Sequence, residues 1–222
     1  MVRKRRYQQP CPIARGLNHL GDRWALLILR DLHAGPARFG DLQTGLTGIA
    51  TNLLSTRLQE LQDSGLIRHR GPESGVRVYE LTELGQGTEL VIMALAEFGA
   101  RMERDGETQP AGNLRLLCLP LKKLLQSAIR NNTPALPQPL SVELNLDGQP
   151  FALRLNQDRV SVQMRPAADA NLRLKSTLQP AIELLDGRLG LLEFMREHTH
   201  VLAAQGLGME RVTSWIEQTP SL

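Results

Sequence analysis

The spacing of hydrophobic residues changes along this chain, and that change constrains the fold more than any other feature. Up to residue 102 apolar side chains recur every three or four residues, the period of amphipathic helices. After residue 139 they alternate with polar ones, the period of half-buried strands. Pro- and Gly-containing stretches at 104–113 and 131–139 interrupt the patterns. We therefore expect a mainly helical domain at 1–104, a linker at 105–113 and an α+β domain at 114–222.

The first domain is predicted to contain five helices and one hairpin. Asp22 can cap the second helix, and Gly65 ends the fourth. A glycine-bearing tip at 71–75 separates two short strands. The expected helices are 13–20, 23–33, 39–45, 51–64 and 84–102, and the expected strands are 67–69 and 76–81.

The second domain is predicted to be an antiparallel sheet with helices against one face. A helix at 114–130 comes first, and an Asp147-Gly148 turn joins the first two strands. After the sheet we expect a helix capped by Thr177, with Pro180 in its first turn, and then an apolar, mostly helical tail to Trp215. The expected strands are 142–146, 151–155, 160–164 and 172–174.

Composition excludes several classes of protein. Hydrophobic residues make up 41% of the 222, which is enough for a core and argues against disorder. Cys11 and Cys118 can form neither a disulfide framework nor a zinc site. The basic start has no apolar stretch after it and no window could span a bilayer, so we expect a cytoplasmic protein without membrane insertion. The five histidines are scattered, and no catalytic signature or phosphate loop is visible. The sequence thus predicts no enzyme, no cofactor and no metal.

The positive charge is concentrated in the first third of the chain. Residues 1–78 hold 12 Lys+Arg and 6 Asp+Glu, whereas residues 105–222 hold 12 of each. A segment with one sign of charge attracts polyanions, so nucleic acid or an anionic surface is the expected partner. The alternative is an ordinary solvated surface.

The helix predicted at 51–64 has the pattern of a DNA-reading helix. Leu54, Leu58 and Leu61 share one face, and the opposite face is polar. Such a helix fits the major groove, where amides and hydroxyls meet base edges and a neighbouring cation meets phosphate. The alternative is an amphipathic surface helix. The predicted DNA-binding residues on this helix are Thr51, Asn52, Ser55, Thr56, Arg57 and Gln59.

The hairpin that follows is basic. Arg68, Arg70 and Arg77 surround its tip, from which they could reach the phosphate backbone or the minor groove. Two helices joined by a turn and followed by a basic hairpin make a winged helix-turn-helix layout. Double-stranded DNA is therefore the predicted partner.

Separated blocks of the first domain resemble the HxlR group of bacterial winged-helix transcription regulators. They are CPIARGLNHLGDRWALLILRDL, GPARFGDL, GIATNLLSTRLQELQDSGLI and VYELTELG, in order over residues 11–102. The resemblance implies that 39–46 and 49–62 form the turn motif and 68–78 the wing. It also implies a homodimer, held by the helices at 13–20 and 84–102, on a pseudo-palindromic operator.

Two positions of this resemblance need separate comment. The family usually has Ser where this chain has Ala50, so another residue must cap the recognition helix, and Thr51 is the candidate. Cys11 lies directly before Pro12, where this family often holds a redox or electrophile sensor. Its alternative role is that of a small buried residue in the dimer contact.

Residues 141–218 resemble the sterol carrier protein domain. The resemblance rests on DGQPFALRLNQDRVSVQ, ADANLRLKST and LLDGRLGLLEFM. It implies an apolar tunnel that accepts a fatty acyl chain or another hydrophobic small molecule, which a regulator could sense. The alternative is a filled core that only supports dimerisation. A second possible function for the whole chain is a lipid carrier whose basic segment docks an anionic surface.

Overall fold

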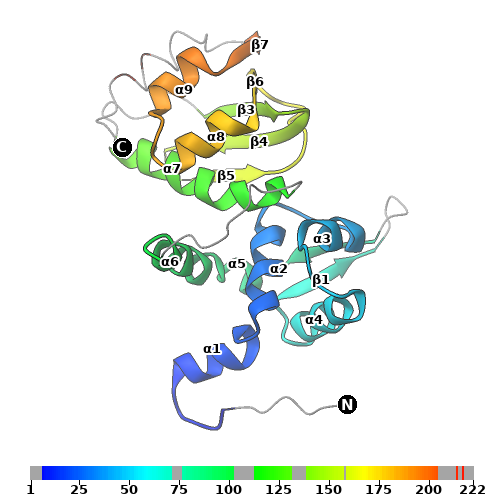
Figure 1. Ribbon diagram of the computed structural model, residues 1–222. Coiled ribbons are helices and arrows are strands. Elements are labelled where there is room, and N and C mark those ends of the chain that lie inside the picture. The colour runs from blue at the N-terminus through cyan, green and yellow to red at the C-terminus, as the bar shows by residue number, and fades with distance from the viewer. Residues whose placement is uncertain are drawn as a thin grey trace. The chain divides into compact units, whose positions relative to one another are not determined.

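In a computed structural model, residues 7–71, 77–102, 113–131, 139–157 and 159–204 are described, together with Ser214 and Glu217. Contacts within the chain divide it into two compact units, residues 1–116 and 117–222 (Figure 1). Most of the predicted linker, the hairpin tip at 72–76 and most of the tail beyond residue 204 lie outside the described residues. The domain boundaries at 104 and 114 therefore stay predictions.

The first unit is a helical domain with one two-stranded sheet. Strands β1 and β2 pair antiparallel, and Ala37 forms an isolated bridge with Tyr79 beside them. Its helices are α1 (Pro12–Leu20), α2 (Arg23–His33), α3 (Phe39–Gly45), α4 (Thr51–Asp63), α5 (Glu83–Gln86) and α6 (Glu89–Gly99), and its strands are β1 (Ile67–Arg70) and β2 (Val78–Leu81).

The local signals of the sequence account for the ends of these elements. The Asp22 carboxylate accepts a hydrogen bond of 2.9 Å from the backbone N–H of Trp24, which confirms it as the cap of α2. Gly65 follows α4 with φ of 69°, a left-handed conformation that favours glycine after a helix. The helices predicted at 13–20, 23–33, 39–45 and 51–64 are confirmed within one residue at each end.

The prediction of a single helix at 84–102 is wrong. The helix is interrupted between Gln86 and Glu89, so that α5 and α6 are separate. Thr82 caps the short α5 by accepting from the N–H of Gly85 at 3.1 Å. Thr88 then donates its hydroxyl hydrogen to the carbonyl of Gly85 at 2.6 Å. These side-chain bonds compete with the helical ladder and end it after one turn.

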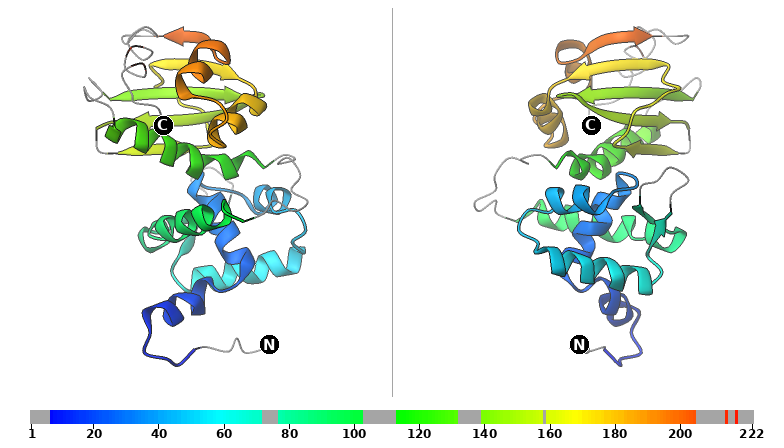
Figure 2. Two further views of the ribbon diagram at one scale, coloured as in Figure 1. Left: turned by 60° about the vertical axis from the view of Figure 1, so that its left-hand side comes forward. Right: turned by 90° about the vertical axis from the view of Figure 1, so that its right-hand side faces the viewer.

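The second unit is built on a five-stranded sheet of order β5-β4-β3-β6-β7. Helices α8 and α9 pack on one of its faces (Figure 2), and α7 contacts β5 and α8. The elements are α7 (Cys118–Asn131), β3 (Leu140–Leu146), β4 (Gln149–Leu155), β5 (Val160–Gln163), β6 (Leu172–Ser176), α8 (Leu178–Leu185), α9 (Leu191–Glu197) and β7 (His200–Ala204).

Three predictions for this unit are corrected. The helix expected from residue 114 begins at Cys118, after a 3-10 turn at Leu114–Leu117. The sheet is mixed rather than antiparallel, because the chain crosses over β4 and β3 and returns with β6 parallel to β3. The tail contains strand β7 where a helix was expected. Its apolar run VLAA is too short for periodicity to distinguish helix from strand.

The core of this unit follows the alternation in the sequence. Along β3 every second residue is buried, and Phe151 on β4 is fully buried. Asp147 and Gly148 have φ of 47° and 87°, as a type I′ hairpin turn requires. Thr177 precedes α8 without capping it; the Asp147 carboxylate accepts from the N–H of Leu178 at 2.9 Å instead.

Among the described residues, no helix combines the length and the apolar character needed to cross a bilayer.

Candidate nucleic-acid interface

Helix α4 presents one apolar face to the core and one polar face to solvent. Leu54, Leu58 and Leu61 are 2% exposed or less. They fix the rotation of the helix, because turning it would expose all three. The predicted orientation is therefore confirmed. The exposed residues of the opposite face are Thr51, Asn52, Ser55, Thr56 and Gln59.

Short local hydrogen bonds order several of these polar side chains. The Asn52 carbonyl oxygen Oδ1 accepts from the N–H of Leu53 at 2.8 Å, and the Thr56 hydroxyl donates to the Asn52 main-chain carbonyl at 2.9 Å. The Gln59 amide donates to Asp63 at 2.8 Å. These bonds restrict the rotamers of the side chains, so ordering them further costs little conformational entropy.

The start of α4 differs from the prediction that Thr51 caps it. Ala50 holds the N-cap position, and no side chain caps the helix. The Thr51 hydroxyl instead accepts a hydrogen bond from the Gln43 amide of α3. This bond links the two helices of the turn motif. Gln43 was not singled out from the sequence, because nothing local marks a contact across the turn.

The Arg57 side chain forms ion pairs within the domain and is mostly buried. Its guanidinium lies 2.8 Å from Asp22 and 2.7 Å from Glu60, and its side chain is only 19% exposed. This geometry shows that Arg57 is engaged within the domain in the absence of DNA, and its predicted contact with phosphate stays a prediction. Asp22 therefore caps α2 and also ties α2 to α4, a second role that sequence reasoning missed.

The hairpin carries the remaining predicted cations. Arg68 and Arg70 on β1 are about two-thirds exposed, and both pair with Glu80 of β2, at 2.8 and 3.4 Å. Arg77 is exposed, just before β2. Burial raises the pKa of Tyr79, whose ring packs 4.1 Å from that of His69, and Arg77 opposes that shift. Two arginines sharing one carboxylate leave the strand pair with excess positive charge.

Large apolar side chains are exposed on α1 and along 84–102, the two segments predicted to form a dimer interface. Leu90 on α6 is 80% exposed and Phe98 is 62% exposed. Exposed apolar surface of this kind marks interaction sites. The other members are Ile13, Leu17, Leu84, Val91, Leu95 and Met102.

Both cysteines are free thiols. Cys11 is half-buried at the N-cap position of α1, whereas Cys118 is buried. The redox role of Cys11 stays a prediction.

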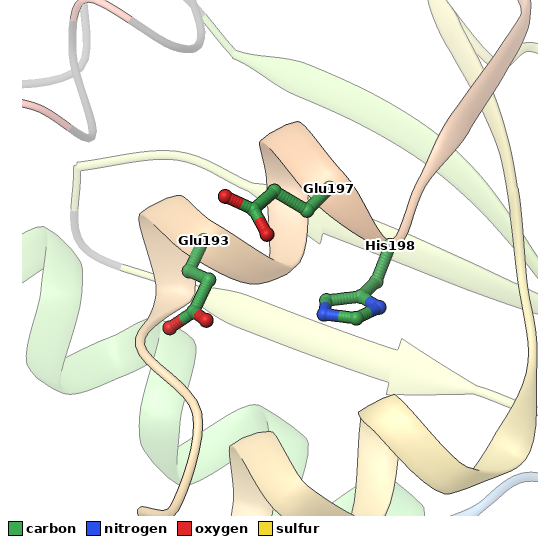
Figure 3. Close-up of side chains that lie close together, drawn as sticks. All are labelled: Glu193, Glu197 and His198. Atoms are coloured by element: carbon green, nitrogen blue, oxygen red, sulfur yellow. The ribbon is translucent and has the colours of Figure 1, made fainter.

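Glu193 and Glu197 on α9 and His198 after it place their side-chain ligand atoms within 4.8 Å of one another (Figure 3). Both carboxylates are exposed, and exposed acidic groups gather in this way without binding a metal. The cluster therefore gives no reason to assign a metal site.

Comparison with known proteins places the first unit. The family model of the HxlR-like helix-turn-helix matches residues 19–107. An uncharacterized HTH-type transcriptional regulator of Synechocystis, sll1512, is 37% identical over 92 residues, covering 40% of this chain and 68% of its own. Another from Methanothermobacter thermautotrophicus is 35% identical over 106 residues, covering 45% of this chain and 81% of its own.

A solved structure, that of the candidate transcription factor PA1607, is 34% identical, with a TM-score of 0.40 over 48% of this chain and 83% of that one. The two regulators are more than 30% identical to the chain, and each is matched over more than two thirds of its own length. The chain belongs to the HxlR-like helix-turn-helix family.

Proposed function

We propose that this protein is a homodimeric transcriptional regulator that binds a pseudo-palindromic operator in double-stranded DNA through α4. The observation that carries the proposal is the exposed polar face of α4, held outward by three buried leucines. No carboxylate interrupts that face before Glu60. A polar helix of this kind fits the major groove, where it can donate to and accept from base edges.

In this proposal the residues of α4 contact bases, and the arginines of the hairpin contact phosphates. Asn52 offers an amide donor and a carbonyl acceptor, the pair that reads adenine, and a good bidentate contact discriminates by about 1–3 kcal/mol. Thr51, Ser55, Thr56 and Gln59 supply further contacts on the same face. Arg68, Arg70 and Arg77 meet phosphates, which adds affinity without sequence preference. Arg57 positions α4 against α2 through Asp22.

A dimer follows from the apolar surfaces of α1 and α6. Two-fold symmetry repeats the same patch on both protomers, so exposed leucines and Phe98 would cover each other. Two recognition helices then enter successive major grooves about 34 Å apart, which explains why a pseudo-palindromic operator is expected.

The reading of bases by α4 is tested by gel shift on a selected operator. We expect Asn52→Ala and Thr56→Ala to weaken operator binding about tenfold or more and to leave non-specific binding unchanged, because they remove base contacts. Arg70→Ala should weaken all DNA binding and lower the salt slope by about 0.9, because one phosphate contact is lost. Gln149→Ala, an exposed residue of the second unit, is the control. Operator binding unchanged in all three variants would sink the assignment of α4.

The dimer is tested by native mass spectrometry of the full chain. Phe98→Glu should convert dimer to monomer at micromolar concentration, because two desolvated carboxylates would face an apolar contact. Leu202→Glu is the matched control, since Leu202 is 61% exposed but lies on β7 of the second unit. A Phe98→Glu protein that stays dimeric, or a monomeric parent chain, would contradict the proposed interface.

The second unit is proposed to sense a fatty acyl or other hydrophobic small molecule, as its resemblance to sterol carrier proteins implies. Such a ligand alters DNA affinity only if it binds the DNA-competent and incompetent states unequally. The lipid-carrier alternative is less favoured, because the matched family covers the helical unit and the related proteins named above are transcriptional regulators.

A further inference from the structure

The crossover between β5 and β6, residues 164–171, lies against strand β3 of the second sheet. The N–H of Ala167 donates to the Glu143 carboxylate at 2.7 Å. The N–H of Asn171 donates to the Ser141 carbonyl at 2.7 Å, and the Asn171 side chain accepts from the N–H of Ser141 at 3.0 Å. These bonds hold the crossover against β3.

A cavity of about 470 Å³ opens beside this crossover. Its floor includes Ser141, Arg154 and Ser161, which lie side by side because the strand registers pair Ser141 with Arg154 and Arg154 with Ser161. Asp169 and Asn171 line the crossover side, and Arg159 lies at the start of the β5 region. The volume lies within the usual range for small-molecule sites.

The charges in this cavity favour an anion. Arg154 binds both carboxylate oxygens of Asp169, at 2.9 and 3.0 Å. The pKa of Asp169 is lowered by its own backbone hydrogen bond and by Arg154, so the carboxylate is ionised and already satisfied. Arg159 brings a second cation, and its guanidinium has no partner among the residues that the structure describes. The lining therefore has a net positive charge.

We propose that this cavity binds a small molecule through an oxyanion group, with Arg159 and Ser161 as donors and the Asp169–Arg154 pair as its wall. A phosphate ester and a carboxylate present the same acceptor-rich chemistry. Its charged and polar lining distinguishes this site from the apolar tunnel that the resemblance to sterol carrier proteins implies. Binding here requires no DNA, so it can fail or succeed separately from the proposed function.

Calorimetric titration of the full chain, without DNA, tests this site. The probes are glucose 6-phosphate, gluconate and uncharged glucose, which share a similar size. We expect one of the two anions to bind and glucose not to bind. The anion that binds shows whether the site takes a phosphate ester or a carboxylate. Arg159→Ala should weaken that binding about tenfold, because it removes a charged hydrogen bond. Arg188→Ala is the matched control, an exposed arginine elsewhere in the same unit.

Ser161→Ala separates a binding role from a structural one. Removing the part-exposed Ser161 hydroxyl should leave the thermal midpoint of the free protein unchanged, while anion binding weakens. Binding of neither anion at millimolar concentration would overturn the proposal. So would equal affinities for the Arg159→Ala and Arg188→Ala proteins.

Discussion

Replacing Asn113 by aspartate is expected to destabilise the first unit by about 3–5 kcal/mol, because it removes the amide donor of the buried Asp31 carboxylate and puts a second carboxylate in its place. The Asn113 amide donates to the Asp31 carboxylate and to the Gly45 carbonyl, both at 2.9 Å. Asp31 is fully buried, and Arg30 is its other partner. The substitution keeps the shape of the side chain and removes both donors, so the effect isolates charge and hydrogen bonding from packing.

Urea unfolding followed by tryptophan fluorescence measures this effect. The chain has two tryptophans, so a Trp215→Phe background makes Trp24 on α2 the only reporter. Asn113→Ala is the control, since it removes the same bonds without adding a charge, and it should cost less. If the aspartate variant is no less stable than the alanine variant, the Asn113 side chain does not lie against the Asp31 carboxylate as the structure indicates.

Gly85→Ala is expected to destabilise the same unit by about 3 kcal/mol or more. A Cβ at Gly85 would lie 1.9 Å from the Leu66 carbonyl oxygen, a backbone atom that cannot rotate away. That carbonyl also accepts from the N–H of Thr82 at 3.0 Å and from its hydroxyl at 3.2 Å. Moving α5 away from β1 to relieve the clash would therefore break the bonds that begin α5.

Gly40→Ala is the matched control for this substitution. Gly40 is exposed on α3, and a Cβ there meets nothing within 4 Å. Alanine is a better helix former than glycine, so this variant should be as stable as the parent or more stable by about 0.5–1 kcal/mol. The free energies of unfolding of the Gly85→Ala and Gly40→Ala variants are measured by the change in Trp24 fluorescence in urea. Similar stabilities for the two variants would show that α5 does not pack on Leu66 as described.

The ends of most elements could be predicted from the sequence because short-range chemistry sets them. Asp22 before α2, Gly65 after α4 and the Asp147-Gly148 turn each act on the next few residues. The break between α5 and α6 escaped prediction, because the apolar spacing continues through it while Thr82 and Thr88 redirect the backbone bonds. Periodicity reports which face is buried, not which carbonyls remain available.

The candidate nucleic-acid interface was also predictable only where it depends on residues close together in the chain. Leucine spacing places the polar face of α4 outward, and the structure agrees. The partners of the arginines were not predictable. Arg57 meets Asp22, which lies 35 residues earlier in the chain, and Arg68 and Arg70 share Glu80 across a strand pair. Charge counts assign a sign to a segment, but they cannot say which cations are already neutralised.

The sequence by itself determined that a helical part precedes a part with strands, the hydrophobic period of each part, the family of the first unit and the outward polar face of α4. These depend on spacing and on residue types close together in the chain. Only the tertiary structure decided the parallel pairing of β3 with β6, the internal role of Arg57, and the cavity beside the crossover. Each of these brings together residues distant in sequence, and such contacts are selected by the packing of the whole unit rather than by any local preference.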